Sequence, residues 1–306
     1  MSATTAPERA DVPRHEADPV LTVDDFSVDY YGAVTTHAVK HVSLTLGRGE
    51  ILGLAGESGC GKSTLAYGIT RLLKPPALIS SGNAAFHSRE GYSIDLSTLG
   101  REELRAFRWD KISMVFQGAM NSLNPVISIE AQLADVFTTH RPEMSRAERT
   151  QRCGDLLERV GVDRARLKSF PHELSGGMRQ RVMIAMAMAL EPQVMIMDEP
   201  TTALDVVVQR EILDEITRLR RELNFAVIFI THDLPLLLEI SDRIAVMRAG
   251  EIIETNTAYE LYTKPKNDYT KMLLASFPSL TGERGDFIRT GVQDKNLTDS
   301  TERAGA

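Results

Sequence analysis

Short apolar and alternating runs, separated by turn residues, fill the first part of the chain. Between residues 20 and 53 the segments LTVDDFSVDY, VSLTL and ILGLAG are broken at Gly32 and at residues 47–49. Alternation of apolar and polar positions between turn residues is typical of β-strands. The pattern therefore predicts a strand-rich opening.

Helical and strand-like patterns alternate after that opening. Helices are predicted at residues 62–73, 146–160, 178–190 and 206–223, and strands at residues 111–116, 194–197, 226–230, 244–247 and 251–254. Residues 74–108 show a looser pattern, and a mainly helical subdomain is predicted for residues 118–175. Alternation of this kind favours an α/β fold with a largely parallel sheet covered by helices.

The segment GESGCGKST lies directly between the strand pattern ILGLA and a helical pattern. It comprises Gly56, Glu57, Ser58, Gly59, Cys60, Gly61, Lys62, Ser63 and Thr64. This spacing matches the loop that binds polyphosphates with backbone N–H groups and a helix N-terminus. Lys62 would then reach the β- and γ-phosphates, and the Ser63 hydroxyl would ligate Mg²⁺. The alternative is a glycine-rich turn with a chance lysine, and the flanking strand and helix argue against it.

Two carboxylates end the apolar strand pattern VMIMDE. Asp198 and Glu199 would lie at the C-terminal edge of the sheet, where open α/β sheets bind ligands. At that edge Asp198 is placed to hold Mg²⁺, and Glu199 is placed to polarise an attacking water molecule. Two solvated acids at a strand end are the alternative, which the neighbouring phosphate-binding pattern disfavours.

The segment LSGGMRQ places a second hydroxyl and two more glycines, Ser175, Gly176 and Gly177, immediately before a helical pattern. This arrangement again suits phosphate at a helix N-terminus. One nucleotide does not need two such sites from one chain. The sequence therefore favours a head-to-tail dimer in which this segment closes over the γ-phosphate held by the partner.

LSGGMRQ, with GESGCGKST before it and VMIMDEPTTALD after it, resembles the signature set of the ATP-binding-cassette (ABC) ATPases over about residues 20–280. The resemblance implies a P-loop NTPase core with an antiparallel β subdomain and a helical signature subdomain. It also implies ATP hydrolysis with ATP and Mg²⁺. The domains expected are a flexible lead-in (1–19), the ATPase domain (20–255) and a C-terminal extension (256–306) that is mobile after residue 282.

The same resemblance assigns roles to four further residues. Tyr30 is the aromatic residue that stacks on adenine, although Tyr31 or a purely structural tyrosine is the alternative. Gln117 contacts Mg²⁺ and the water, and His232 contacts the γ-phosphate. Asp205 lies in the loop that crosses the dimer interface, and it is also suited to cap the following helix.

Composition limits the partners and the location. The 42 acidic and 35 basic residues give a net charge of −7, which argues against a dedicated nucleic-acid surface. The two cysteines, Cys60 and Cys153, lack metal-ligand spacing and suggest a reducing compartment. No apolar run is long enough to cross a bilayer, and the N-terminus lacks the apolar region of a signal peptide. Any membrane crossing is therefore expected from another chain.

Three segments, FQGAMNSLNPVISI, SFPHELSGGMRQRVMIAMAMAL and ELYTKPKNDYTKMLLASFPSL, resemble the oligopeptide/dipeptide group of ABC importers, which also includes nickel and oligosaccharide transporters. The resemblance implies a peripheral subunit on the cytoplasmic face of the membrane. Its partners would be a second ATPase, with a heterodimer favoured over a homodimer, two permease subunits and an external binding protein. A non-transport regulatory ATPase is the main alternative. A P-loop kinase is disfavoured, because LSGGMRQ would then have no function.

Two features depart from that group. Trp109 stands where the group commonly has glycine, so the resemblance does not predict the conformation of this loop. Many members also carry a C-terminal cysteine cluster, but this chain has no cysteine after Cys153. We therefore expect no iron–sulfur cluster, since such clusters are commonly held by four cysteine thiolates.

Overall fold

A computed structural model describes residues 18–202 and 204–276. Nearly all of the expected lead-in, and the whole tail expected to be mobile after residue 282, lie outside the described residues. The description below therefore concerns the expected ATPase domain and the first part of the C-terminal extension. None of the described helices combines the length and the apolar character needed to cross a membrane.

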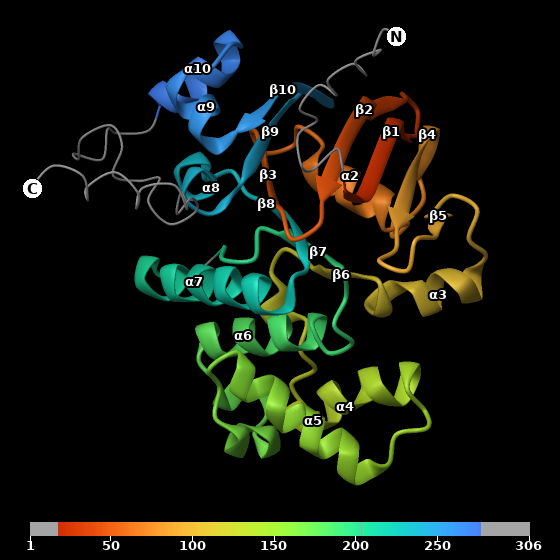
Figure 1. The fold of residues 1–306 in the computed structure, drawn as a ribbon, viewed down its shortest axis with the longest axis vertical. Helices are drawn as coiled ribbons and strands as arrows, with labels where there is room; N and C mark the ends of the chain where they lie inside the picture. Colours follow the sequence, from red (N-terminus) through yellow and green to blue (C-terminus); the bar gives the residue numbers. More distant parts are fainter. Residues whose placement is uncertain (1–17, 203, 277–306) are drawn as a thin grey trace, which may run out of the picture.

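A six-stranded sheet forms the centre of the molecule (Figure 1). Its order is β10 (Glu251–Thr257), β9 (Arg243–Arg248), β3 (Ile51–Ala55), β8 (Ala226–Ile230), β7 (Val194–Asp198) and β6 (Ile112–Val115). Every neighbouring pair is parallel except β9 and β10. The prediction of a largely parallel sheet is confirmed. Because β3, β6, β7 and β8 run in parallel, the loops that follow them meet at one edge.

A second, four-stranded antiparallel sheet covers helix α2 (Lys62–Ile69). Its order is β2 (Thr36–Gly47), β1 (Pro19–Tyr30), β4 (Ala77–His87) and β5 (Ser93–Asp95). Buried side chains of β1, β2 and β4 share one apolar cluster with Leu65, Ala66 and Ile69 of α2. This sheet is the antiparallel β unit that the resemblance implies.

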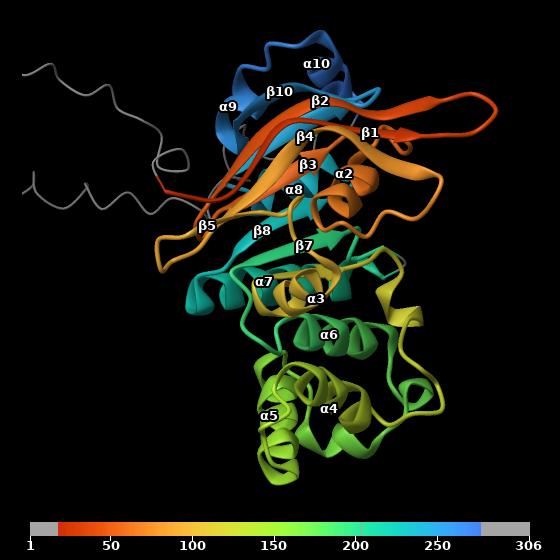
Figure 2. The same ribbon diagram turned by 90° about the vertical axis from the view of Figure 1, so that its right-hand side faces the viewer.

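The remaining described helices cover the central sheet or extend from it. They are α3 (Arg101–Asp110), α4 (Ile129–His140), α5 (Arg146–Arg159), α6 (Gly176–Ala187), α7 (Val206–Leu223), α8 (Leu234–Ile240), α9 (Ala258–Thr263) and α10 (Asp268–Ala275). Helices α4 and α5 lie at the end of the molecule far from the antiparallel sheet, and α6 lies between them and β7 (Figure 2). The segment predicted as mainly helical, residues 118–175, contains α4, α5 and three short 3-10 helices.

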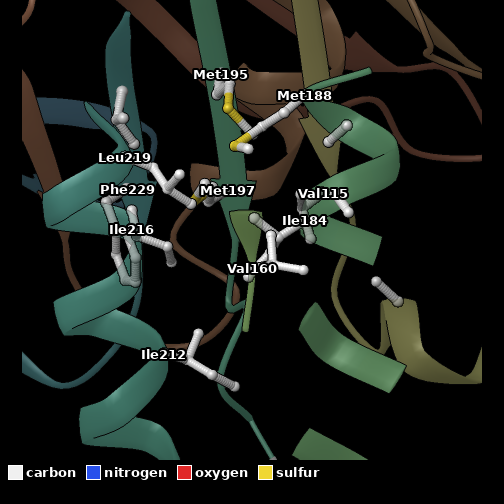
Figure 3. Close-up of a cluster of buried hydrophobic side chains, with 14 of the residues drawn as sticks. Val115, Val160, Ile184, Met188, Met195, Met197, Ile212, Ile216, Leu219 and Phe229 are labelled. Atoms are coloured by element: carbon white, nitrogen blue, oxygen red, sulfur yellow. The ribbon is translucent and has the colours of Figure 1, made fainter. Parts of the chain in front are cut away.

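The larger apolar core joins the central sheet to α6 and α7. Met195 and Met197 of β7 point toward Ile216 and Leu219 of α7 and toward Met188, which directly follows α6 (Figure 3). All five side chains are buried. Because β7 is buried along its whole length, the carboxylates at its end are held on a rigid support.

Two expectations about residues 62–108 are wrong. The helix predicted to reach residue 73 ends at Ile69, because Arg71 adopts a left-handed conformation with φ +53°. The stretch described as loose contains β4, β5 and α3. Serine, glycine and asparagine in β4 have low strand propensity, so this strand depends on its antiparallel pairing with β1, which local sequence does not reveal.

Candidate nucleotide-binding site

The phosphate-binding loop connects β3 to α2, as the sequence predicts. Gly56 has φ +147° and Gly61 has φ +110°, values that L-residues rarely adopt. A Cβ atom at Gly56 would lie 2.2 Å from the carbonyl oxygen of Met247, and one at Gly61 would lie 2.3 Å from that of Ala38. The loop is therefore pressed against β2 and β9, and both positions require glycine.

Lys62 is buried inside this loop, with its charge at the centre. Its Nζ donates hydrogen bonds to the carbonyl oxygens of Gly56 at 2.7 Å and Glu57 at 2.8 Å. The Sγ atom of Cys60 lies 3.7 Å away. Since α2 begins at Lys62, the ammonium group and the positive end of the helix dipole lie together. This arrangement is suited to binding an anion.

Ser63 and Asp198 meet at the end of β7. The Ser63 hydroxyl donates a 3.0 Å hydrogen bond to Oδ1 of Asp198. The second carboxylate oxygen, Oδ2, is buried and has no hydrogen-bond partner among the described residues. The pKa of Asp198 is raised above its usual value. Burial is the main cause, the Ser63 hydrogen bond lowers the pKa in part, and the Glu199 carboxylate raises it again. An unpaired carboxylate oxygen in this position is suited to a cation.

Glu199 is held by groups from three parallel strands. Its Oε2 accepts a 2.9 Å hydrogen bond from Nε2 of Gln117, which follows β6. The Thr202 hydroxyl donates to the same oxygen at 3.0 Å. On the other oxygen, Nδ1 of His232, which follows β8, lies 3.2 Å from Oε1. The structure thus brings together the three residues that the sequence proposes for catalysis: Gln117, Glu199 and His232.

Thr202 is the residue of this cluster that the sequence analysis missed. A threonine in the loop after a strand usually forms only local turn contacts. The available signal was its position, three residues after Glu199 and in the same tight turn, where its hydroxyl can reach that carboxylate. The backbone N–H of Thr202 also bonds to the carbonyl oxygen of Glu199 at 3.3 Å.

Tyr30 lies against the start of α2. Its hydroxyl is 3.3 Å from the hydroxyl of Thr64, the last residue of the phosphate-binding loop. Tyr31 is 47% exposed, and its backbone N–H bonds to the carbonyl oxygen of Pro76. Of the two aromatic candidates, Tyr30 has a described side-chain contact with the loop.

One of the predicted segments, residues 175–177, lies away from this cluster. Helices α2 and α6 lie on opposite sides of β7 in both views (Figures 1 and 2). The described hydrogen bonds include none between the loop and the residues Ser175, Gly176 and Gly177. Instead, Ser175 caps α6 by accepting a hydrogen bond from the backbone N–H of Met178 at 3.2 Å. One chain alone therefore does not complete a site from both phosphate-binding patterns.

Asp205 lies at the start of α7. Its Oδ1 accepts a 3.0 Å hydrogen bond from the backbone N–H of Val208, so the predicted capping role is confirmed. The residue is also exposed, as are Val206 and Val207 beside it. This leaves the start of α7 open to contact with another chain.

The chain is similar to ATP-binding proteins of bacterial transporters. Residues 39–202 match the ABC transporter family. The peptidoglycan transport ATP-binding protein YejF of Agrobacterium fabrum is 46% identical over 264 residues, which cover 85% of this chain and 47% of that protein. The oligopeptide transport ATP-binding protein OppD of Bacillus subtilis is 41% identical over 266 residues, which cover 85% of this chain and 72% of that protein. The chain thus spans about half of the first relative and about three quarters of the second.

Two solved structures share the fold. The ATP-binding cassette MJ0796, in a dimeric post-hydrolysis state bound to ADP and Pi, matches with a TM-score of 0.67 and 29% identity; the match covers 78% of this chain and 98% of that one. CbiO1 of Clostridium perfringens, part of the ABC transporter complex cbiONQ, matches with a TM-score of 0.68 and 28% identity; the match covers 81% of this chain and 92% of that one. The chain belongs to the ABC transporter family and carries that family's ATP-hydrolysing cassette.

Proposed function

We propose that this chain is the ATP-hydrolysing subunit of a binding-protein-dependent importer of oligopeptides or dipeptides. The observation that carries the proposal is the Glu199 carboxylate, fixed by Gln117, Thr202 and His232 at the edge of the sheet that also holds the phosphate-binding loop. The names of OppD and of the dipeptide transport protein DppD, both 41% identical, support peptides as the cargo.

The loop residues bind the nucleotide. Lys62 faces the β- and γ-phosphates as a buried point charge, and the loop N–H groups surround the phosphate oxygens. For Lys62 to do so, its Nζ gives up bonds to loop carbonyl oxygens and takes phosphate oxygens in their place. Tyr30, next to Thr64, stacks on the adenine ring.

The residues present fit a magnesium ion. Ser63 and Asp198 would hold Mg²⁺, with the buried and unpartnered Oδ2 of Asp198 as the strongest argument. Gln117, which donates a hydrogen bond to the adjacent residue Glu199, would also contact the ion. Among the described residues no cluster of three or more His, Cys, Asp or Glu side chains can hold a metal by itself. This suits an ion that is also bound by phosphate oxygens and water. When bound, Mg²⁺ neutralises charge on the β- and γ-phosphates.

Glu199 acts as the general base of hydrolysis. Its carboxylate accepts a proton from a water molecule as the water oxygen forms a bond to the γ-phosphorus. The bond between that phosphorus and the β,γ-bridging oxygen breaks, and ADP and phosphate leave. Gln117 and Thr202 hold the carboxylate in place, and His232 contacts the γ-phosphate.

A second cassette completes the site. Ser175, Gly176 and Gly177 do not reach this chain's own loop, so they serve the nucleotide of a partner in a head-to-tail dimer. Asp205 and the exposed start of α7 cross the same interface. We propose a heterodimer with a second ABC ATPase. Closure of this dimer pulls the helical subdomains together and drives two permease subunits, which receive cargo from an external binding protein.

The domain division and the location follow from this assembly. We propose residues 20–255 as the ATPase domain, with residues 118–175 as its helical subdomain. Residues 1–19 are then a lead-in and residues 256–306 a C-terminal extension. The chain is bound peripherally at the cytoplasmic face of the membrane through the permease.

ATP hydrolysis by the complete transporter in lipid vesicles tests this proposal. Binding protein loaded with a short peptide should stimulate hydrolysis, and the same protein without cargo should stimulate it less. Vesicles that lack the permease serve as the control. Equal rates with and without the loaded binding protein would contradict an import function and favour a regulatory ATPase.

A further inference from the structure

Helix α6, which begins in the segment LSGGMRQ, packs on helix α7, which begins directly after Asp205. The two helices lie side by side in both views (Figures 1 and 2). Under the proposed function, the start of each helix faces a partner chain. The contact between these two starts therefore determines how Ser175, which caps α6, is placed relative to Asp205, which caps α7.

Gly177, the second residue of α6, does not need to be glycine for its own backbone conformation. The residue is helical, and its φ lies outside the left-handed region that favours glycine. Apart from proline, glycine is the residue least favourable to a helix. Alanine would therefore be preferred at this position if its side chain had room.

Val208 of α7 occupies the space that a side chain at Gly177 would need. A Cβ atom at Gly177 would lie 2.6 Å from Cγ1 of Val208. This is far less than the roughly 3.5–4.0 Å that two carbon atoms prefer. Because valine is branched at Cβ, it has one strongly preferred rotamer in a helix, and Cγ1 does not easily swing aside. The pair therefore fixes how closely α6 approaches α7.

Val208 is itself held in place from two directions. Its backbone N–H donates the 3.0 Å hydrogen bond to Oδ1 of Asp205 that caps α7. Its side chain is half-buried and packs against the larger apolar core. One residue thus contacts Asp205 through its backbone and Gly177 through its side chain.

Ion pairs one turn further along keep the two helices in register. Arg181 lies four residues after Gly177, on the same face of α6. Its Nη2 is 3.3 Å from Oε2 of Glu211, and its Nη1 is 3.6 Å from Oε2 of Glu215. The side chains of Arg181 and Glu215 are only 16% and 15% exposed, so salt screens this pair less than a surface pair. The starts of α6 and α7 are therefore parts of one packed unit.

We propose that Val208 is a positioning residue for the segment Ser175, Gly176 and Gly177. Its side chain sets the distance between the starts of α6 and α7, so that Ser175 and Asp205 meet the partner's nucleotide together. Gly177 is then glycine because Val208 leaves no room for a side chain, and not because the nucleotide lies against it. This inference rests on the proposed composite site.

Gly177→Ala in the assembled transporter introduces the side chain that Val208 excludes. The added methyl group should push α6 away from α7 and displace Ser175. We expect ATP hydrolysis to fall about 10- to 100-fold, because a displacement of about 1 Å in a reacting site can cost that much. ATP affinity of this chain's own loop should not change.

Val208→Ala in the same chain removes Cγ1 and makes room for the methyl group. The double variant Gly177→Ala/Val208→Ala should hydrolyse ATP within about 3-fold of the rate of Val208→Ala alone, since compensating changes at contacting residues are coupled and not additive. Gly177→Ala/Val207→Ala is the matched control. Val207 is the preceding valine and is 69% exposed, so its truncation makes no room beside Gly177. This control should remain as slow as Gly177→Ala.

Urea unfolding of the full chain tests the contact without any need for activity. Gly177→Ala should lower the midpoint of unfolding, because overpacking outweighs the better helix propensity of alanine. Val208→Ala should lower the midpoint less when Gly177→Ala is present than when it is absent. Equal effects of Val208→Ala in both backgrounds would show that the two side chains do not compete for space, and would overturn the inference.

The hydrolysis rates separate this inference from the function beneath it. Slow hydrolysis by Gly177→Ala that Val208→Ala does not restore would overturn the positioning role, because the nucleotide itself would then need the glycine. Hydrolysis at the parent rate by Gly177→Ala, with Ser175→Arg inactive, would overturn the positioning role alone. Hydrolysis at the parent rate by both Gly177→Ala and Ser175→Arg would show that the composite site is wrong.

Discussion

Glu199 combines a left-handed backbone conformation with a carboxylate whose two oxygens both have hydrogen-bond partners. Its φ is +46°, which costs a non-glycine residue about 1–3 kcal/mol. The backbone N–H is fixed to the carbonyl oxygen of Ile230 at 2.9 Å, and both carboxylate oxygens have partners. Such constraint is expected where a group must face a reacting water in one orientation.

Thr202 offers a test of this constraint. Thr202→Val removes the hydroxyl and keeps the branched shape, so Glu199 loses one of its hydrogen bonds. We expect ATP turnover to fall about 3- to 10-fold, the usual effect of one hydrogen bond. ATP affinity should stay the same, because no described hydrogen bond joins Thr202 to the loop. Thr202→Ser, which keeps the hydroxyl, should turn over ATP at nearly the parent rate, and a serine variant as slow as the valine variant would exclude this role.

The elements that the sequence predicts best are those whose signals are local. Helix α7 and strand β8 were predicted with the bounds they have, because α7 has an Asp205 cap and an amphipathic pattern and β8 is a fully apolar run. Strand β4 and the end of α2 were not, since they depend on pairing with β1 and on the left-handed Arg71. Local patterns do not encode either feature.

The candidate site shows the same division. The loop and the two carboxylates could be located from spacing, because each belongs to a strand–loop–helix unit. Ser175 was located from a hydroxyl and two glycines before a helical pattern, and Asp205 from the family resemblance. The meeting of Gln117, Glu199 and His232 followed from the expected parallel sheet and the family resemblance. Thr202 could not be found, because a hydroxyl contact across a turn leaves no periodic signal.

The kink at the end of α3 explains how Trp109 replaces a glycine. Trp109 has φ +71° and ψ −42°, a conformation that glycine adopts without strain, and its ring packs against the larger core. Trp109→Gly loses the ring but relieves the backbone, whereas Trp109→Ala loses the ring and keeps the strain. We expect the glycine variant to be more stable than the alanine variant by about 1 kcal/mol in urea unfolding. The reverse order would show that the backbone is not left-handed at this position.

At the scale of the whole molecule, the separation of α6 from α2 supports the proposal that the second phosphate-binding pattern serves a partner chain. Ser175→Arg places a bulky cation where the partner's γ-phosphate is expected. ATP binding to this chain's own loop should remain, while hydrolysis at the partner's site should stop. Ser145→Arg is the matched control, since Ser145 is likewise an exposed helix-capping serine, on α5.

Measurements of nucleotide binding to each chain and of hydrolysis at each site test whether the site is composite. Loss of ATP affinity in the chain that carries Ser175→Arg, with normal hydrolysis at the partner's site, would contradict the composite site. Equal effects of Ser145→Arg and Ser175→Arg would assign both to loss of a helix cap, which typically costs about 1 kcal/mol of stability.

Hydrolysis driven by Glu199 is the central claim, and the rate of phosphate release by Glu199→Gln tests it most directly. The amide keeps the size of the side chain but cannot accept the proton of water. In the assembled transporter the variant should bind ATP with the parent affinity and accumulate as the closed dimer. Its hydrolysis rate should fall roughly 10²- to 10⁴-fold, the usual contribution of a general base. Hydrolysis by Glu199→Gln at the parent rate would contradict the account.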